Sequence, residues 1–154
     1  MLSRRGRSSV TYWEGRNDDI GAERCRSADF RRPSVQKPAT ANSRGLPAWR
    51  ARRVMAYIDT RLAGRVSVAE MARLTGLSTG HFSRAFKQSF GVSARTFLMR
   101  RRIEFAQGMM LSTDLLLNEI AHCCGLCDQP HLSKMFRSVV GENPSAWRRA
   151  RCDT

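Results

Sequence analysis

The stretch Glu70-Met71-Ala72-Arg73-Leu74-Thr75-Gly76-Leu77 recurs further along the chain as Glu119-Ile120-Ala121-His122-Cys123-Cys124-Gly125-Leu126. The residues that follow also recur: Phe82-Ser83-Arg84-Ala85-Phe86-Lys87 returns as Leu132-Ser133-Lys134-Met135-Phe136-Arg137, with one residue inserted before the second copy. Each copy combines a small alanine in a short helix, a glycine turn and a second helix with apolar residues at helical spacing. Two such copies predict tandem helix-turn-helix units at about 66–91 and 115–141.

Capping signals set the helix boundaries in the first unit. We expect a first helix to begin at Pro47, whose fixed φ suits a first helical turn, and to end at Gly64. Ser67 and Glu70 have the spacing of a capping box, in which the hydroxyl and the carboxylate bind free backbone amides. They predict a short helix over about 68–75.

The next two helices are each predicted to begin after a serine. Ser78 caps the second helix of the unit, whose buried stripe consists of Phe82, Phe86 and Phe90. Ser93 caps a longer helix that reaches about Leu111, a length of roughly 28 Å. We therefore expect this long helix to join the two units.

The exposed face of each second helix is the predicted contact with DNA. The major groove admits one helix and presents a distinct pattern of donors and acceptors for each base pair. The residues on these faces are Thr79, Gly80, His81, Ser83, Arg84 and Lys87, and then Gln129, Pro130, His131, Ser133, Lys134 and Arg137. Arg84 suits a bidentate contact to guanine and Gln129 a contact to adenine, whereas Lys87 and Arg137 are better placed for phosphates. An ordinary solvated helix face is the alternative for each charged residue.

The charge of the chain also favours a polyanionic partner. The 154 residues carry 27 Lys and Arg against 13 Asp and Glu, which gives a formal net charge of +14. Phosphate contacts by such side chains release counterions and favour binding. No apolar stretch approaches the roughly 18 residues that a membrane helix requires, and no signal peptide is evident, so we expect a cytoplasmic protein without a membrane partner. We expect the five cysteines to be reduced.

The composition divides the chain into two parts. Residues 1–45 contain Arg, Ser, Gly and Pro without helical or alternating periodicity, and they predict a disordered tail that either is simply solvated or binds phosphates nonspecifically. Residues 46–154 interleave basic and apolar side chains at helical spacing, and they predict the folded domain.

Two further motifs accompany the repeat. They are Arg102-Ile103-Glu104-x-Ala106 in the long helix and the closing sequence Gly141-x-Asn143-Pro144-Ser145-Ala146-Trp147-Arg148. With these motifs and the two units, residues 46–151 resemble the DNA-binding domain of the AraC/XylS family of bacterial transcription regulators.

The resemblance implies an all-α domain of seven helices, with two helix-turn-helix units joined by a long linker helix. It implies a nucleoid-associated transcription regulator, often an activator, that binds promoter DNA as a monomer and contacts RNA polymerase. It also supports a narrower set of base-contact candidates, namely Gly80, Ser83, Arg84, Gln129, Pro130, Ser133 and Lys134.

Three features depart from the family pattern. The segment before residue 46 is too short and too polar for an effector-binding domain, so we expect no small-molecule sensing and no cofactor. Gly80 offers no side chain and Pro130 replaces a polar residue, which weakens the expected base readout at both positions. Leu116 matches the capping Ser67, so its helix is expected to begin without a side-chain cap.

A metal or redox sensor is an alternative reading of one cluster. His122-Cys123-Cys124-Gly125-Leu126-Cys127, with His131 nearby, has ligand types and spacings that zinc can use. In the repeat, however, Cys124 matches Thr75 at a buried helix end and Cys127 matches the capping Ser78. The simpler interpretation is packing and capping, with no metal site.

A nonspecific, nucleoid-type nucleic-acid-binding protein is the second alternative, because the net charge alone would produce salt-sensitive binding to any duplex. An enzyme is not expected, because the sequence shows no paired carboxylates, Ser/His/Asp set or phosphate-binding glycine loop and so no catalytic residue.

Overall fold

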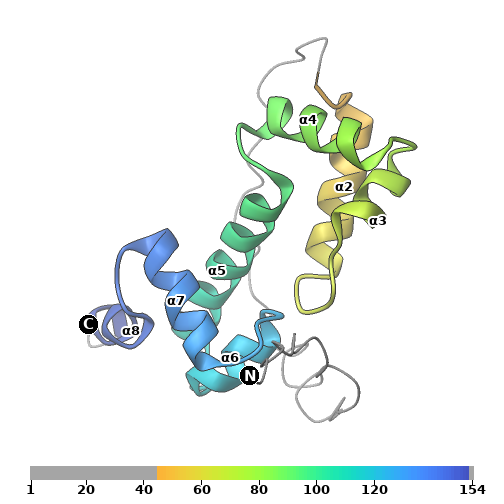
Figure 1. Cartoon of the computed structure of the whole chain (residues 1–154). Coiled ribbons are helices and arrows are strands. Elements are labelled where there is room, and N and C mark those ends of the chain that lie inside the picture. Colours follow the sequence, from red (N-terminus) through yellow and green to blue (C-terminus); the bar gives the residue numbers. More distant parts are fainter. Residues whose placement is uncertain (1–44, 153–154) are drawn as a thin grey trace, which may run out of the picture.

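The computed structural model describes residues 45–152, which form seven helices and no strand (Figure 1). The helices are α2 (Ala48–Thr60), α3 (Val68–Leu74), α4 (Thr79–Phe90), α5 (Ala94–Ser112), α6 (Leu117–Cys123), α7 (Gln129–Val140) and α8 (Pro144–Cys152). The predicted all-α class and the seven helices are confirmed. The predicted tail falls on residues 1–45, of which 1–44 lie outside the described part. No helix within 45–152 is long and apolar enough to cross a membrane.

The long helix α5 joins two separate hydrophobic cores. Its first turns bury Ala94, Phe97 and Leu98 against α2, α3 and α4. Its later turns bury a second set against α6, α7 and α8, namely Ile103, Ala106, Met109 and Met110. In Figure 1, α5 accordingly runs between an upper group of helices and a lower one. Each predicted helix-turn-helix unit therefore has its own core, and α5 belongs to both.

The apolar stripes of α4 and α7 match as the repeat predicts. Phe82 and Phe86 are fully buried in the first core, and Leu132 and Phe136 occupy the same places in the second. The last member of each stripe, Phe90 or Val140, is only partly buried. These stripes hold the second helix of each unit against its core, so that the opposite face is left exposed.

The first helix differs at both ends from its predicted bounds. Pro47 is the N-cap residue and α2 begins one residue later, at Ala48. The helix ends at Thr60, whose hydroxyl donates back to the carbonyl of Ala56 at 2.9 Å. The prediction that Gly64 ends the helix is wrong, because Gly64 lies in the following turn and donates its backbone N–H to Arg61.

The capping box at the start of α3 forms only in part. The Ser67 hydroxyl accepts from the backbone N–H of Glu70 at 3.1 Å, as predicted. The Glu70 carboxylate instead accepts a hydrogen bond from the Tyr57 hydroxyl at 2.6 Å. This bond lowers the pKa of Glu70 and ties α3 to α2.

The second unit is capped differently from the prediction. Cys127 does not cap α7, because the inserted residue moves the cap to Asp128, whose carboxylate accepts from the His131 N–H at 2.8 Å. Leu116 provides no side-chain cap for α6, as predicted. Its backbone N–H donates to the Glu119 carboxylate at 2.8 Å, so half of a capping box survives.

Candidate nucleic-acid interface

The exposed face of α4 carries the candidates of the first unit. Gly80, Ser83, Arg84 and Lys87 are all exposed, on the side opposite the buried Phe82 and Phe86. A Cβ added at Gly80 would meet no atom within 4 Å, so the backbone there lies open to a close approach. The Ser83 hydroxyl donates to the carbonyl of Thr79 at 2.8 Å, which leaves its oxygen as an acceptor.

The exposed face of α7 carries the candidates of the second unit. Gln129, Pro130 and Lys134 are exposed and lie in the first half of the helix, whereas Ser133 is partly buried. Pro130 occupies the first turn of α7, where its missing N–H costs no hydrogen bond. An open pocket runs along this face and is lined by Ser133, Lys134, Arg137 and Ser138. Ser138 was not among the residues predicted from the sequence, because serine at a helix surface carries no distinctive signal.

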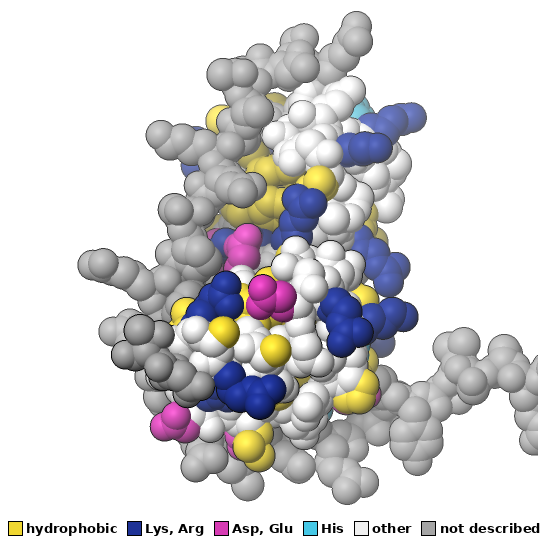
Figure 2. All heavy atoms as spheres, turned by 90° about the vertical axis from the view of Figure 1, so that its left-hand side faces the viewer, with side chains coloured by type: hydrophobic (Ala, Val, Ile, Leu, Met, Phe, Trp, Pro, Cys, Tyr) yellow, Lys and Arg dark blue, Asp and Glu magenta, His cyan; other side chains and the backbone are white. Residues whose placement is uncertain are grey.

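Basic side chains extend over the side of the molecule on which α7 and α8 lie. Figure 2 shows Lys and Arg side chains along the length of this face, with few acidic side chains among them. The described ion pairs use Arg101 and Arg151 as their cations. Lys87, Lys134 and Arg137 therefore have no ion-pair partner in the described part of the chain. Free cations on exposed helix faces fit phosphate contacts.

Two arginines fix the loops that precede the units. The Arg102 guanidinium, from α5, donates to the carbonyls of Leu62 at 3.1 Å and Gly64 at 2.8 Å. In the second unit Arg148, from α8, donates to the carbonyls of Thr113 and Leu115. Burial lowers the pKa of Arg102. Each unit is thus tied to the helix that follows it by side-chain bonds to main-chain oxygens. The sequence repeat does not predict these bonds, because Arg102 and Arg148 are not at matching positions of the two copies.

A buried ion pair joins α2 to α5. Arg101 is 8% exposed and bonds the carboxylates of Asp59 and Glu104, both at 2.9 Å. Burial alone would lower the pKa of Arg101, but its bonds to the two carboxylates outweigh that effect and raise it. The charge is therefore paired with two carboxylates, although the buried Nε of Arg101 has no hydrogen-bond partner, and this arginine joins helices rather than facing a ligand.

The turn of the second unit touches the loop of the first. Gly125 has a φ of +70°, and a Cβ added there would lie 2.6 Å from the Leu62 carbonyl oxygen and 2.9 Å from that of Ala63. Only glycine suits both the left-handed backbone and the close approach. With the Arg102 bonds to the same loop, this contact fixes one unit against the other.

Within residues 45–152 the cysteines are not brought together as the zinc site of the alternative reading. Cys124 is fully buried, and this burial raises the pKa of its thiol to about 12. Cys127 is exposed, and Cys123 is disulfide-bonded, so the expectation of reduced thiols is wrong for Cys123. Within residues 45–152 no three His, Cys, Asp or Glu side chains are grouped to hold a metal ion. Cys124 packs at the end of α6 as Thr75 does at the end of α3.

The arrangement defines a class of protein: two helix-turn-helix units on a shared linker helix, each with an exposed second helix, as in DNA-binding domains. A family model described as a helix-turn-helix domain matches residues 71–150. The chain belongs to the AraC-type family of helix-turn-helix transcription regulators.

Curated relatives of this chain are transcription regulators of the same kind. The transcriptional activator NphR of Rhodococcus sp. is 29% identical over 133 residues, which cover 80% of this chain and 39% of that protein. The activator RhaS of Salmonella arizonae is 30% identical over 122 residues, which cover 79% of this chain and 42% of that protein. The chain thus spans about two-fifths of the length of these relatives.

Two solved structures show the same fold. The C-terminal domain of AraT, a response regulator from Geobacillus stearothermophilus, has a TM-score of 0.63 and 31% identity, over 66% of this chain and 85% of that one. The DNA-binding domain of AdpA, solved in complex with a target DNA, has a TM-score of 0.62 and 27% identity, over 68% of this chain and 96% of that one.

Proposed function

We propose that this protein is a sequence-specific transcription regulator that reads two adjacent segments of the major groove, one with α4 and one with α7. The observation that carries the proposal is the pair of matched, exposed helix faces on units that α5, Arg102 and Gly125 hold in one arrangement. A fixed pair of reading helices suits two half-sites on one side of a duplex.

Each helix has a proposed division of labour along its length. In the first unit Gly80, Ser83 and Arg84 contact base edges, and in the second Gln129, Pro130, Ser133 and Lys134 do so. Lys87 and Arg137 lie further along their helices and contact phosphates. A bidentate arginine contact to guanine by Arg84 is the strongest source of discrimination in this set.

The proposal includes how the protein acts in the cell. We infer that it binds as a monomer, since one chain already presents two reading helices. We infer further that it works at the nucleoid in the bacterial cytoplasm and contacts RNA polymerase when it activates a promoter. NphR and RhaS are named as activators, which supports activation rather than repression.

Selection of bound duplexes from a random pool tests the proposal. We expect an enriched sequence with two conserved segments, bound at least about 10³-fold more tightly than random duplex at equal salt. Binding of all duplexes with similar affinity would instead make the chain a nonspecific nucleic-acid-binding protein and would end the proposal.

A further inference from the structure

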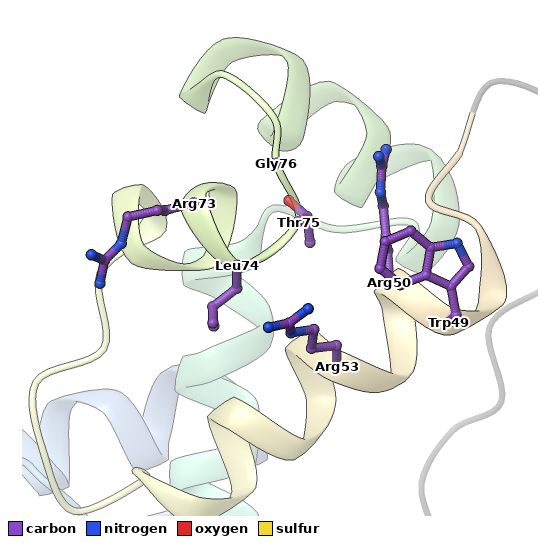
Figure 3. A pocket seen from close by; sticks show the side chains of 7 residues that line it. All are labelled: Trp49, Arg50, Arg53, Arg73, Leu74, Thr75 and Gly76. Atoms are coloured by element: carbon purple, nitrogen blue, oxygen red, sulfur yellow. The ribbon is translucent and has the colours of Figure 1, made fainter.

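A second basic site lies outside the reading faces, where the start of α2 faces the end of α3. An open pocket there is lined by Trp49, Arg50, Arg53, Arg73, Leu74, Thr75 and Gly76. Figure 3 shows the Arg50 side chain beside the Trp49 indole, and the Arg53 guanidinium directed toward Leu74. We call this feature the Trp-Arg pocket. The DNA-reading function proposed above uses none of its side chains.

The charge of the Trp-Arg pocket is unbalanced. Its lining includes three arginines and no acidic residue. None of the three takes part in an ion pair in the described part of the chain. Asp59, the acidic residue of α2, binds Arg101 and so does not neutralise them. Exposed Arg53 and Arg73 therefore raise the local positive potential and favour an anion.

Arg50 has an unused donor. Its Nε is buried and has no hydrogen-bond partner, which leaves part of its hydrogen-bonding capacity unmet. Its guanidinium carbon lies 5.0 Å from the centre of the Trp49 ring, and this stacking restricts the side chain. A guanidinium held in place beside an open pocket is preorganised for a carboxylate or a phosphate.

The apolar part of the pocket favours an acidic protein segment over a nucleic-acid backbone. Trp49 is 51% exposed although it is a large hydrophobic side chain, and Leu74 next to Arg53 is only partly buried. Exposed tryptophan and arginine are the residues most enriched in the energetic centres of protein interfaces. A phosphate chain would use the guanidiniums and leave the apolar surface uncovered.

The Trp-Arg pocket extends past both ends of α4. The backbone N–H of Leu46, just before α2, donates to the Ser89 hydroxyl in the last turn of α4 at 2.7 Å. The base-contact candidates lie in the first half of α4, and a recognition helix contacts bases with its N-terminal residues. The start of α2 therefore adjoins the end of α4 that is further from the bases, whereas Thr75 and Gly76, which also line the pocket, lie in the turn just before Ser78, the N-cap of α4.

We propose that the Trp-Arg pocket binds an acidic segment of a partner protein, with carboxylates on Arg50 and Arg53 and an adjacent apolar side chain against Trp49. Such a segment would combine Asp or Glu with a large hydrophobic residue.

Fluorescence anisotropy of a labelled peptide with alternating Asp and Phe tests this on the full chain. We expect Arg53→Glu to weaken binding of this peptide by about tenfold or more, and Trp49→Ala to weaken it comparably. The matched control is Arg52→Glu, because Arg52 is exposed on the same helix but does not line the pocket. It should change the affinity by less than about twofold, since it alters only the net charge. A peptide with Asn in place of Asp should not bind measurably.

Binding of a duplex is measured in parallel on the same variants. We expect Arg53→Glu and Arg52→Glu to weaken the duplex equally. A larger loss for Arg53→Glu would mean that the pocket binds DNA phosphates, and the proposal would be wrong. It would also be wrong if the peptide failed to bind, if both glutamate variants weakened the peptide alike, or if the Asn peptide bound as well. These results leave the DNA-reading function untouched, because that function is judged by duplex selection.

Discussion

Arg84 and Lys87 lie within one turn of each other on the exposed face of α4, yet their expected roles differ. Each is exposed, and neither has an ion-pair partner in the described residues. A guanidinium can bind the two acceptors of a guanine edge, whereas an ammonium acts as a point charge that suits a phosphate. The two side chains therefore permit a comparison within one helix.

We predict that Arg84→Ala weakens binding to the selected duplex by ~1–3 kcal/mol and relaxes the preference at a single base pair. Lys87→Ala should weaken binding to every duplex alike and lower the slope of log affinity against log salt by about one. Titrations of selected and scrambled duplexes at several salt concentrations measure both effects. An Arg84→Ala loss that was equal on both duplexes would assign Arg84 to the phosphates instead.

The start of α6 shows how one residue affects an element. Leu116 occupies the N-cap with 70% of its surface exposed, and only the Glu119 half of the capping box is present. At the matching start of α3, the Ser67 hydroxyl caps the helix. Each unit therefore begins with one half of a capping box, the hydroxyl half in the first and the carboxylate half in the second.

We predict that Leu116→Ser stabilises the fold by about 0.5–1 kcal/mol, because a hydroxyl cap is gained and little buried apolar surface is lost. Ser67→Ala is the mirror control and should destabilise by about 1 kcal/mol. Urea unfolding of the three proteins measures the changes. A destabilised Leu116→Ser variant would show that the leucine contributes more by packing than its exposure indicates.

The turn glycines provide a second test at the scale of elements. Gly76 and Gly125 occupy the same place in the two units, with φ of +66° and +70°. A Cβ at Gly76 would meet nothing within 4 Å, whereas one at Gly125 would contact the carbonyls of Leu62 and Ala63. An alanine would therefore strain the backbone at both positions, but its Cβ would clash with neighbouring atoms only at Gly125.

We predict that Gly76→Ala destabilises by roughly 1–2 kcal/mol through the left-handed backbone alone. Gly125→Ala should cost about 1 kcal/mol or more beyond that, because the loop at Leu62 has to move. It should also weaken a duplex with two half-sites more than a duplex with one. Equal unfolding free energies for the two variants would mean that the loop at Leu62 and Ala63 moves away from residue 125 with no loss of stability.

The sequence predicted the elements better than the contacts between them. The repeat and the capping serines predicted α3, α4, α5, α6 and α7 to within a few residues. The prediction that Cys127 caps α7 was wrong, because the second copy has one extra residue before this helix. That insertion places Asp128, rather than Cys127, at the N-cap. The bonds of Arg102 and Arg148 to main-chain carbonyls were not predicted, since any loop offers such acceptors and no residue type marks them.

At the scale of the whole molecule, the decisive property is that the two reading helices are not independent. Helix α5 has 19 residues, a length of roughly 28 Å, and takes part in both cores. Arg102 and Gly125 fix the first loop against the second unit. Because the connection is stiff, binding of α4 in one groove segment would fix which segment α7 can reach, and the reverse.

The spacing between half-sites should therefore control affinity. We predict two protected segments on one face of the duplex, with centres about one helical turn, or ~10 base pairs, apart. An insertion of about 5 base pairs between them turns the second groove to the opposite face, and binding should fall to that of a single half-site. An insertion of about 10 base pairs restores the face but adds ~34 Å, more than the length of α5, so it should not restore affinity either. Footprinting and titration of the three duplexes distinguish this rigid arrangement from a flexible tether, which would recover affinity with the longer insertion.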